Sequence, residues 1–360
     1  MKTILVAIEF PPAVGGVETY YSKLKQYWSS DLQVITNQHN VLIGHFWPIF
    51  GWLKGFFTLL PVLRREKPEW VLAGEILPIG TIVYLASFFV RSFKYGIFLH
   101  GLDFSMIRKV SRKQWLATLI LRKAKIVICA NHYTAKEVRK LYPDLGNISV
   151  VNPGVEVNDL VRNTDDVLST NITAVTLYKF VLLTVGRLVQ RKGVDKTLLA
   201  IAKLKNIIPN LYYVIIGDGP DKQYLEDLIR ELQLGEIVTI VSGASDEEKN
   251  QWLAACDIFI MPTRNIDGDY EGYGIVYLEA GFFGKPVIAG NSGGVSDAVQ
   301  HERNGLVVDG NDEMEISEAI VRLYNDQALQ IKLGNQGKAL SLASGWEQRV
   351  KAIETLLAHV

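Results

Sequence analysis

Cysteine is scarce in this sequence, and no low-complexity tract or long uninterrupted apolar run is present. Two cysteines, Cys129 and Cys256, among 360 residues exclude a disulfide-rich scaffold and suit a reducing compartment. No His and Cys residues have the spacing of a zinc site. With 48% hydrophobic and 21% charged residues, the chain is not disordered, collagenous or coiled coil. Its length favours two domains.

Targeting and membrane-spanning segments are also missing from the pattern. The apolar start, Thr3 to Phe10, is interrupted by Glu9 and runs into Pro11-Pro12 instead of a small-residue cleavage site. The uncharged stretch from Ile76 to Val90 has 15 residues, fewer than the roughly 18–20 that cross a bilayer. We therefore expect a buried first strand and a cytoplasmic protein.

The net charge of zero conceals an asymmetry. Residues 1–150 contain 19 Lys and Arg against 9 Asp and Glu, a net charge of +10. Residues 151–360 contain 19 against 29, a net charge of −10. The basic half favours an anionic partner such as phosphate, nucleic acid or a membrane surface.

Short runs of Val, Ile, Leu and Phe predict two series of β-strands. Each run is apolar throughout, as expected of parallel strands covered on both faces. Amphipathic helical patterns fall between them, which predicts an α/β fold with two doubly wound, Rossmann-like domains. The predicted strands are 3–9, 32–36, 69–73, 95–99, 126–130 and 148–151, then 180–186, 211–217, 237–241, 257–261, 286–289 and 305–308; predicted helices include 17–28, 111–123, 193–207 and 221–233.

The polar segment from Val157 to Thr176 is predicted to be a linker, which divides the chain near residue 165. The domains would then be 1–165 and 166–345. Ligands of such sheets bind beyond the carboxyl ends of the strands. Two facing sheets would therefore place a central cleft between the domains.

Two motifs follow predicted strands of the first domain. Gly15-Gly16 lies between a strand and a helix, where glycine lets backbone N–H groups approach an anion, although a plain turn explains it equally well. His100 ends another strand and could point toward a ligand or be a buried structural histidine. Asp103, three residues later, favours the functional interpretation.

The second domain has cations after its first strand. Gly186-Arg187 is followed by Lys192, and a guanidinium fork with a nearby ammonium suits a diphosphate, although both could be solvated surface cations. Gly217, after the next strand, indicates either close approach of a ligand or a sharp turn.

The segment from Asp269 to Ala280 carries the most specific pattern. A helix is predicted to begin near Gly274, so that the N–H groups of Ile275 and Val276 face an anion. Glu271 would lie in the preceding loop and Glu279 inside the helix. This separation disfavours a glycosidase pair, which needs carboxyl groups ~5–5.5 Å apart. The Asp267-Gly268-Asp269 triplet is interpreted as a polar loop, not a metal site.

Together these motifs resemble glycosyltransferase family 4, the retaining nucleotide-sugar transferases of GT-B fold. The resemblance covers nearly the whole chain, and its most specific part is the pair of glutamates Glu271 and Glu279 followed by Ser292-Gly293-Gly294. The run from Glu271 to Ile288 resembles bacterial mannosyltransferases that act on phosphatidylinositol mannosides. The resemblance also implies that the C-terminal helix, residues 346–360, packs back on the first domain.

The resemblance implies a role for each matching residue. Gly16 would donate to phosphate, and His100 would contact the donor sugar. Arg187 and Lys192 would clamp the diphosphate without a metal or cofactor. Glu271 would bind hydroxyls of the transferred sugar, and Glu279 would hold the ribose.

The basic half contains a long segment without acidic residues, from Phe104 to Lys136, with cations and Trp115. An aromatic cluster, His45 to Trp52, precedes it. Such a composition suits an anionic bilayer surface, at ~1 kcal/mol per well-placed cation, but also an ordinary solvated helix face.

The sequence therefore predicts a hexosyltransferase that moves a sugar, with mannose from GDP-mannose as first candidate, to a lipid or lipid-linked saccharide at the inner membrane face. UDP-glucose and UDP-N-acetylglucosamine are the other donors. A soluble acceptor such as a sugar phosphate is the main alternative. A nucleic-acid-binding module lacks a motif, and an inactive scaffold disagrees with the intact set of site residues.

Overall fold

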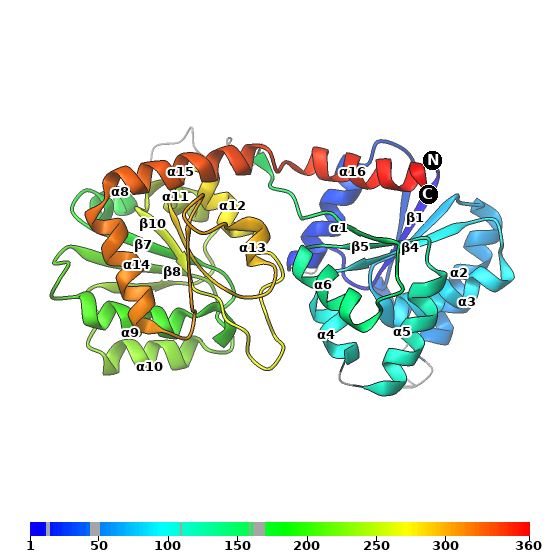
Figure 1. Cartoon of the computed structure of the whole chain (residues 1–360), viewed down its shortest axis with the longest axis horizontal. Helices are drawn as coiled ribbons and strands as arrows, with labels where there is room; N and C mark the ends of the chain where they lie inside the picture. Colours follow the sequence, from blue (N-terminus) through cyan, green and yellow to red (C-terminus); the bar gives the residue numbers. More distant parts are fainter. Residues whose placement is uncertain (12–14, 44–50, 109, 158–159, 161–169) are drawn as a thin grey trace. The chain divides into compact units, whose positions relative to one another are not determined.

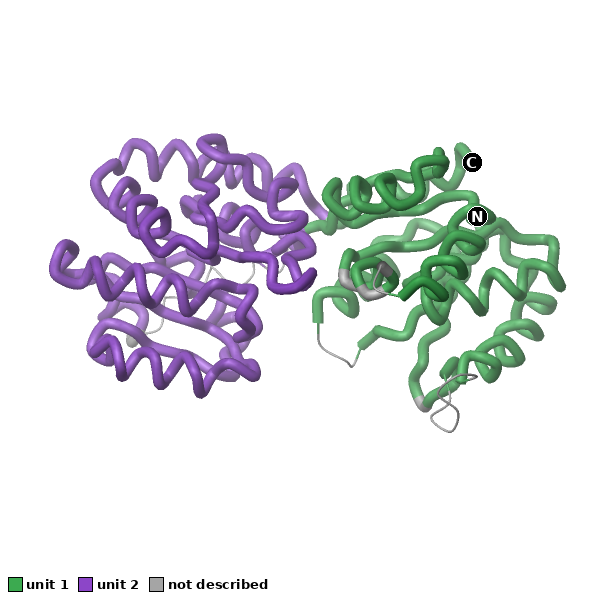
Figure 2. Tube along the Cα trace, turned by 60° about the horizontal axis from the view of Figure 1, so that its bottom comes forward, with its two compact units in different colours: residues 1–154, 346–360 green, residues 155–345 purple. Residues whose placement is uncertain are grey.

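The computed structural model describes residues 1–11, 15–43, 51–108, 110–157, 160 and 170–360. The chain divides into two compact units (Figure 2): unit 1 comprises Met1–Gly154 and Trp346–Val360, and unit 2 comprises Val155–Gly345. The boundary expected near residue 165 lies outside the described residues. The expectation of a linker up to Thr176 is wrong for α8 (Thr170–Thr176), because Ile172 in this helix is buried in the core of unit 2.

Unit 1 is built on a six-stranded parallel sheet (Figure 1) with the order β2-β1-β3-β4-β5-β6. Apart from the exposed Lys94 at the start of the fourth strand, its strands are buried or half-buried along their length, as the apolar runs predicted. The strands are β1 (Thr3–Ala7), β2 (Leu32–Thr36), β3 (Trp70–Ala73), β4 (Lys94–Leu99), β5 (Ile126–Cys129) and β6 (Ile148–Val150).

Two helical layers cover this sheet. The apolar faces of α2, α3, α5 and α6 form one core, and those of α1 and α16 form the other. The C-terminal helix α16 thus belongs to unit 1, although it follows all of unit 2 in the sequence. The helices are α1 (Gly16–Tyr27), η1 (Gln38–Asn40), α2 (Trp52–Glu66), η2 (Ile76–Gly80), α3 (Thr81–Phe89), α4 (Leu102–Arg108), α5 (Ser111–Lys123), α6 (His132–Leu141) and α16 (Trp346–His359).

Unit 2 contains a second six-stranded parallel sheet, with the order β12-β11-β10-β7-β8-β9. Its strands are β7 (Phe180–Val185), β8 (Leu211–Ile216), β9 (Val238–Val241), β10 (Ile258–Met261), β11 (Val287–Gly290) and β12 (Leu306–Val308). The two sheets confirm the prediction of two doubly wound α/β domains.

Helices also cover both faces of the second sheet. One core includes side chains of α9, α10 and α14, and the other includes side chains of α8, α11, α12 and α13. The helices are α8, η3 (Gln190–Lys192), α9 (Val194–Leu204), α10 (Lys222–Glu231), α11 (Asp246–Ala255), α12 (Ile275–Phe282), α13 (Val295–Ala298), α14 (Glu313–Asn325) and α15 (Gln327–Leu342).

The strand orders define where each sheet can bind a ligand. In unit 1 the chain moves outward from β1 on both sides, so the switch point lies between β1 and β3. In unit 2 it lies between β7 and β10. Ligands of open α/β sheets bind at the carboxyl ends of the strands at such points. Among the described residues, none of the helices has both the length and the apolar character needed to cross a bilayer.

Candidate active site

Unit 2 brings four charged side chains together at the carboxyl ends of β7 and β10. Arg191 and Lys192 lie on η3, shortly after β7, while Asp269 and Glu271 follow β10. Lys192 Nζ is 2.7 Å and Arg191 Nη1 is 2.6 Å from the same oxygen, Oε2 of Glu271. Arg191 Nε is 3.1 Å from Asp269 Oδ1. The cluster therefore lies at the switch point, where a ligand is expected.

Glu271 and Lys192 are almost buried, with side chains 10% and 11% exposed. Burial raises the pKa of Glu271, but the combined attraction of Lys192 and Arg191 is larger, so this pKa is lowered. Glu271 is therefore a carboxylate at neutral pH. Because an ammonium has three N–H donors, Lys192 can bind Glu271 and a second anionic group at once.

The loop with Glu271 is fixed by backbone contacts. The N–H of Gly294 donates to the carbonyl oxygen of Glu271 at 2.9 Å. Gly293 has a left-handed conformation with φ of 57°, and a Cβ atom there would lie 2.2 Å from the same carbonyl oxygen. The glycine pair after β11 thus lets two loops touch, which orients the carboxylate toward η3.

A second buried ion pair fixes η3 itself. Arg264 is 4% exposed, and its Nη2 is 2.7 Å from Asp195 Oδ2 at the start of α9. The backbone N–H of Arg264 donates to the carbonyl oxygen of Arg191 at 2.8 Å. The segment after β10 therefore holds both the anionic and the cationic part of the cluster.

Helix α12 begins directly after this loop, as the glycines predicted. Gly274 precedes it in the left-handed conformation, and the N–H groups of Ile275 and Val276 lie in its first turn. The first N–H groups of a helix have no partner within the helix and favour anions.

Glu279 lies inside the same helix and is paired with a lysine from α11. Lys249 Nζ is 3.3 Å from both carboxylate oxygens of Glu279 and 3.4 Å from Asp246 Oδ1. Burial lowers the pKa of Lys249, but the two carboxylates outweigh it, and the pKa is raised. Glu279 is therefore oriented by a charged neighbour.

The remaining predicted residues of unit 2 differ in their surroundings. Arg187 is exposed and makes no hydrogen bond or ion pair with the described residues. The N–H groups of Gly186 and Gly217 donate to strand neighbours, Ile216 at 2.9 Å and Val241 at 3.0 Å. A Cβ at Gly217 would lie 2.0 Å from the Gly186 carbonyl oxygen, so sheet packing alone requires this glycine.

In unit 1, Gly15 and Gly16 lie at the start of α1. Gly16 is exposed, and a Cβ atom there would meet nothing within 4 Å. Thr19 Oγ1 donates to the Gly15 carbonyl oxygen at 2.8 Å. The backbone of this first turn is thus accessible to a ligand.

His100 follows β4 and contacts Tyr21 of α1. Its Nε2 is 2.8 Å from Tyr21 Oη, which also donates to the carbonyl oxygen of Gly74. Because a phenol has one proton, His100 must donate through Nε2–H, which leaves Nδ1 as an acceptor. Burial lowers the pKa of His100 to about 4, so the ring is neutral at physiological pH.

Three carboxyl groups surround this edge of unit 1. Asp103 Oδ1 accepts from the N–H of Gly101 at 3.0 Å, whereas Asp103 Oδ2 and Glu75 Oε1 are buried without a hydrogen-bond partner among the described residues. Burial raises the pKa of Asp103 to about 6 and, with repulsion from Asp103 and Glu9, that of Glu75 to about 8. Burial and Glu18 raise the pKa of Glu9. Within the described chain, no three such groups could hold a metal ion.

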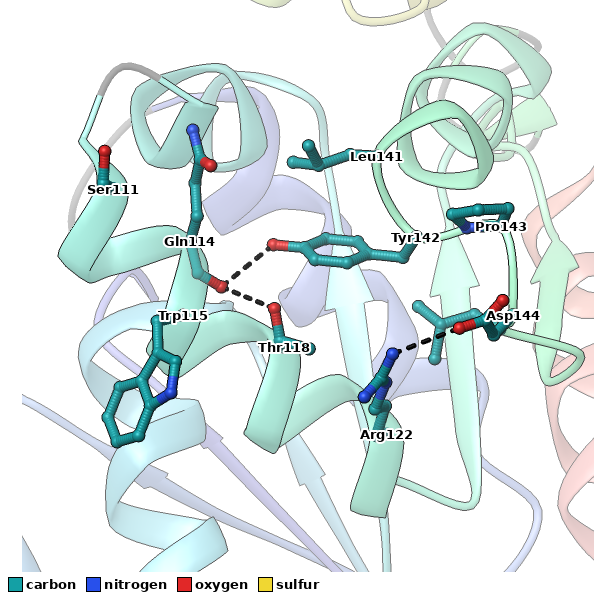
Figure 3. A pocket seen from close by; sticks show the side chains of 10 residues that line it. Ser111, Gln114, Trp115, Thr118, Arg122, Leu141, Tyr142, Pro143 and Asp144 are labelled. Carbon is teal, nitrogen blue, oxygen red and sulfur yellow. Dashed lines mark hydrogen bonds and ion pairs between the residues drawn. The ribbon is translucent and has the colours of Figure 1, made fainter.

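A separate hollow of about 390 Å³ lies between α5 and the segment after α6 (Figure 3). The hydroxyls of Tyr142 and Thr118 donate to the Gln114 carbonyl oxygen at 3.2 and 2.8 Å, and Arg122 pairs with Asp144 at 3.1 Å. Its polar groups thus satisfy one another, and no sequence-predicted site residue lines it.

Several residues of these clusters were not predicted as site residues, among them Arg191, Tyr21, Glu75 and Lys249. Arg191 is adjacent to Lys192 in the sequence, and this adjacency could have identified it. Tyr21, Glu75 and Lys249 gave no comparable signal, because each meets its partner only through the fold.

Comparisons with known proteins show that the chain is similar in sequence to glycosyltransferases. Residues 172–340 match the family described as glycosyl transferases group 1. A GDP-mannose-dependent α-(1-6)-phosphatidylinositol monomannoside mannosyltransferase of Mycobacterium tuberculosis is 38% identical over 42% of this chain and 40% of its own length. A GDP-mannose-dependent monoacylated α-(1-6)-phosphatidylinositol monomannoside mannosyltransferase of Corynebacterium glutamicum is 26% identical over 94% of this chain and 92% of its own length.

Over most of unit 2 the chain is similar to glycosyl transferases group 1, in agreement with the resemblance of its motifs to glycosyltransferase family 4. Its match to the M. tuberculosis enzyme spans less than half of that relative. A D-inositol 3-phosphate glycosyltransferase of Pseudarthrobacter chlorophenolicus is 32% identical over 47% of this chain and 40% of that relative.

Solved structures confirm the GT-B fold of this chain. Anabaena Alr3699/HepE, crystallised with UDP, has a TM-score of 0.81 at 20% identity and covers the full length of both chains. Sucrose-phosphate synthase of Thermosynechococcus elongatus has a TM-score of 0.74 at 20% identity over 100% of this chain and 99% of its own.

Proposed function

We propose that this protein is a glycosyltransferase that transfers a hexose, with retention of configuration, from a nucleotide diphosphate sugar to a lipid or lipid-linked saccharide acceptor at the cytoplasmic membrane surface. The observation that carries the proposal is the Arg191–Lys192–Glu271 cluster at the switch point of unit 2, in which Lys192 and Glu271 are almost buried. The names of the M. tuberculosis and C. glutamicum relatives support GDP-mannose as first candidate donor. UDP-glucose and UDP-N-acetylglucosamine remain alternatives.

In this proposal the donor diphosphate binds to unit 2. The exposed guanidinium of Arg187 and the ammonium of Lys192 neutralise its charge, and the first turn of α12 adds the N–H groups of Ile275 and Val276. Glu271 accepts hydroxyls of the transferred sugar. Glu279 accepts the ribose hydroxyls while Lys249 holds its carboxylate in place.

The reaction breaks the bond between C1 of the sugar and the diphosphate oxygen and forms a bond between C1 and the acceptor oxygen. The departing phosphate oxygen takes the proton of the acceptor hydroxyl, so no further base is needed. Fixed cations stabilise the negative charge that grows on the diphosphate, and we propose that they do so without a metal ion.

His100 and Gly16 contribute from unit 1. Neutral His100 offers Nδ1 as an acceptor for a sugar hydroxyl, and the exposed first turn of α1 offers backbone donors to phosphate. Asp103 positions this edge through the N–H of Gly101.

The acceptor class rests on the surface of unit 1, where exposed cations accompany exposed aromatic rings. A soluble acceptor such as a sugar phosphate is the second candidate, because a relative named as a D-inositol 3-phosphate glycosyltransferase also matches this chain. Transfer in detergent-free buffer to water-soluble sugar phosphates, without transfer to lipid extracts, would favour the second candidate.

The donor assignment is tested by thermal-shift measurements with a panel of nucleotide sugars, followed by transfer assays. A ligand present at 100 times its Kd stabilises the folded state by ~2.7 kcal/mol. Lys192→Met should lower the transfer rate by ~100-fold or more, since it removes a fixed cation from the leaving group. Lys338→Met, on the exposed face of α15, is the control. Near-normal transfer by the Lys192 variant, or loss of transfer in EDTA, would reject the mechanism.

A further inference from the structure

The helical layer of unit 1 contains an apolar pocket of about 300 Å³. It lies among α2, η2, α3 and α5, and it is distinct from the hollow of Figure 3. Carbon atoms dominate its lining, whose residues are Trp52, Leu77, Pro78, Thr81, Tyr84, Leu85 and Leu116.

This pocket lies toward the edge of unit 1 that carries the candidate site. Trp52 is the first residue of α2, and Leu77 is two residues beyond the buried Glu75. Leu116 lies in the first half of α5. Helix α2 follows β2 and η2 follows β3, and a helix that follows a parallel strand begins at the carboxyl edge of the sheet, so Trp52 and Leu77 lie near the same edge as His100 and Glu75.

The helices α2, α3 and α5 also expose aromatic rings on their outer faces, and Trp115 of α5 lines the hollow of Figure 3 as well. Phe57, Phe89 and Trp115 are 68%, 61% and 66% exposed. Phe89 of α3 contacts Phe56 of α2, with ring centroids 5.5 Å apart. Lys123 of α5 lies over the ring of Phe88 at 3.2 Å from its centroid, so the three helices form a continuous surface.

The charge of this surface has one sign along most of its length. Helices α3 and α5 contain no Asp or Glu, and α2 contains only Glu66 at its last position. Exposed cations accompany the aromatic rings: Lys54, Arg64, Arg65, Arg112, Lys113, Arg122 and Lys123. Cations combined with apolar rings favour contact with an anionic bilayer over contact with a protein surface of mixed charge.

We propose that this pocket binds one acyl chain of the lipid acceptor. This inference rests on the proposed function and deepens it, because it says how the acceptor is held. An acyl chain that passes from a bilayer into an apolar pocket exchanges one apolar environment for another, so the step gains little affinity. The pocket instead fixes the position of the chain, so that the polar head group lies at the edge with His100 and Glu75.

The test uses tryptophan fluorescence, because Trp52 lines the pocket whereas Trp115 is exposed on the surface. Figure 3 shows Trp115 extending from α5 away from Tyr142. The probe is a vesicle made of phosphatidylcholine and phosphatidylglycerol, with bromine in the middle of the phosphatidylcholine acyl chains. Bromine quenches only nearby indoles. The quenching that comes from each tryptophan is obtained by comparing the fluorescence of the full chain with that of Trp52→Phe and of Trp115→Phe.

We expect brominated chains to quench both Trp52 and Trp115 when phosphatidylglycerol is present. Leu85→Phe fills the pocket and should reduce the quenching of Trp52 about twofold or more, since interiors leave little room for a second occupant. Sedimentation with the vesicles and the quenching of Trp115 should not change. Leu228→Phe in α10 of unit 2, also half-buried, is the matched control.

Two outcomes would overturn the proposal. Quenching confined to Trp115 would mean that the surface touches the bilayer while the pocket stays empty. Equal quenching of Trp52 with and without Leu85→Phe would mean that no chain occupies this space. Neither readout requires a donor, so the nucleotide-sugar binding and transfer assays decide the proposed function separately.

Discussion

Burial sets the charge of single residues at the carboxyl edge of unit 1. His100 has its pKa lowered to about 4, while Asp103 and Glu75 have theirs raised to about 6 and about 8. In each case the main cause is desolvation, which disfavours the charged form. The two directions have opposite consequences for stability.

We expect the imidazole of His100 to remain neutral, with the proton on Nε2, from pH 8 down to about pH 5. Its folded pKa of about 4 lies below the ordinary 6.5, so its contribution to stability is complete above pH 6.5 and is lost as the pH falls toward 4. Nitrogen NMR of labelled histidine reports tautomer and titration together. A midpoint near 6.5, or a proton on Nδ1, would contradict the hydrogen bonding to Tyr21.

Glu75 should behave in the opposite way. Its folded pKa of about 8 lies above the ordinary 4.5, so its contribution is complete below pH 4.5 and is lost as the pH rises through 8. Glu75→Gln should therefore raise the melting temperature at pH 9 and leave it nearly unchanged at pH 4.5. One pKa unit corresponds to ~1.4 kcal/mol.

The control for this measurement is Glu347→Gln, at an exposed position of α16. The melting temperature of this variant should depend on pH in the same way as that of the unchanged chain. Parallel melting curves for the Glu75 variant and the original chain between pH 5 and 9 would show that Glu75 is ionised throughout.

Sequence reasoning identified residues in both sites from their place after predicted strands. It placed Glu271 in a loop and Glu279 in a helix, which the structure confirms. It did not foresee that Glu271 is shared by Lys192 and Arg191, or that Glu279 is paired with Lys249. Such pairs join segments many residues apart, and nothing in local spacing encodes them. The aromatic cluster from His45 to Phe50 lies outside the described residues.

At the scale of elements, α16 completes the core of unit 1 from the far end of the chain. Trp346 is 3% exposed, and its ring lies 5.2 Å from that of Tyr20 in α1. Ser29 Oγ donates to Glu354 at 2.7 Å. Unit 1 therefore needs the C-terminal residues to close one face of its sheet.

Trp346→Ala should destabilise unit 1 by about 3–5 kcal/mol, because it removes a large buried side chain and leaves a cavity. Hydrogen exchange should show faster exchange in β1 and β4, with β7 and β8 unchanged. Trp115→Ala removes the same side chain from an exposed position and should change stability by less than about 0.5 kcal/mol. Equal effects of both variants would contradict the packing of α16.

The strands were predictable because short apolar runs of this length, bounded by glycine and polar residues, seldom form anything other than buried strands. All twelve predicted strands overlap observed ones, from β1 to β12. The prediction failed at α8, where the polar composition of Thr170–Thr176 indicated a linker. Among the side chains described in this helix only Ile172 is buried, and one apolar residue per turn is too weak a periodic signal to predict a helix.

At the scale of the whole molecule, the two halves of the chain carry opposite net charges, and only the basic first half favours an anionic membrane surface. We expect vesicle binding to depend on phosphatidylglycerol and to weaken several-fold between 0.1 and 1 M salt, since the screening length falls from ~10 to ~3 Å. Sedimentation at each salt concentration checks this. Uncharged phosphatidylcholine vesicles are the control, and binding to them should vary little. Salt-independent binding to anionic vesicles would assign the contact to the aromatic rings alone.

The shared carboxylate of Glu271 has one more consequence. An empty site lined only with guanidinium and ammonium groups would attract every small inorganic anion in the cell. Here the carboxylate of Glu271 already neutralises part of the charge of Arg191 and Lys192. Free orthophosphate would therefore bind with little gain in free energy. Under the proposed function, a ligand that brings a sugar as well as a phosphate would engage the Glu271 carboxylate instead of competing with it, and the site would thereby favour the complete donor over phosphate alone.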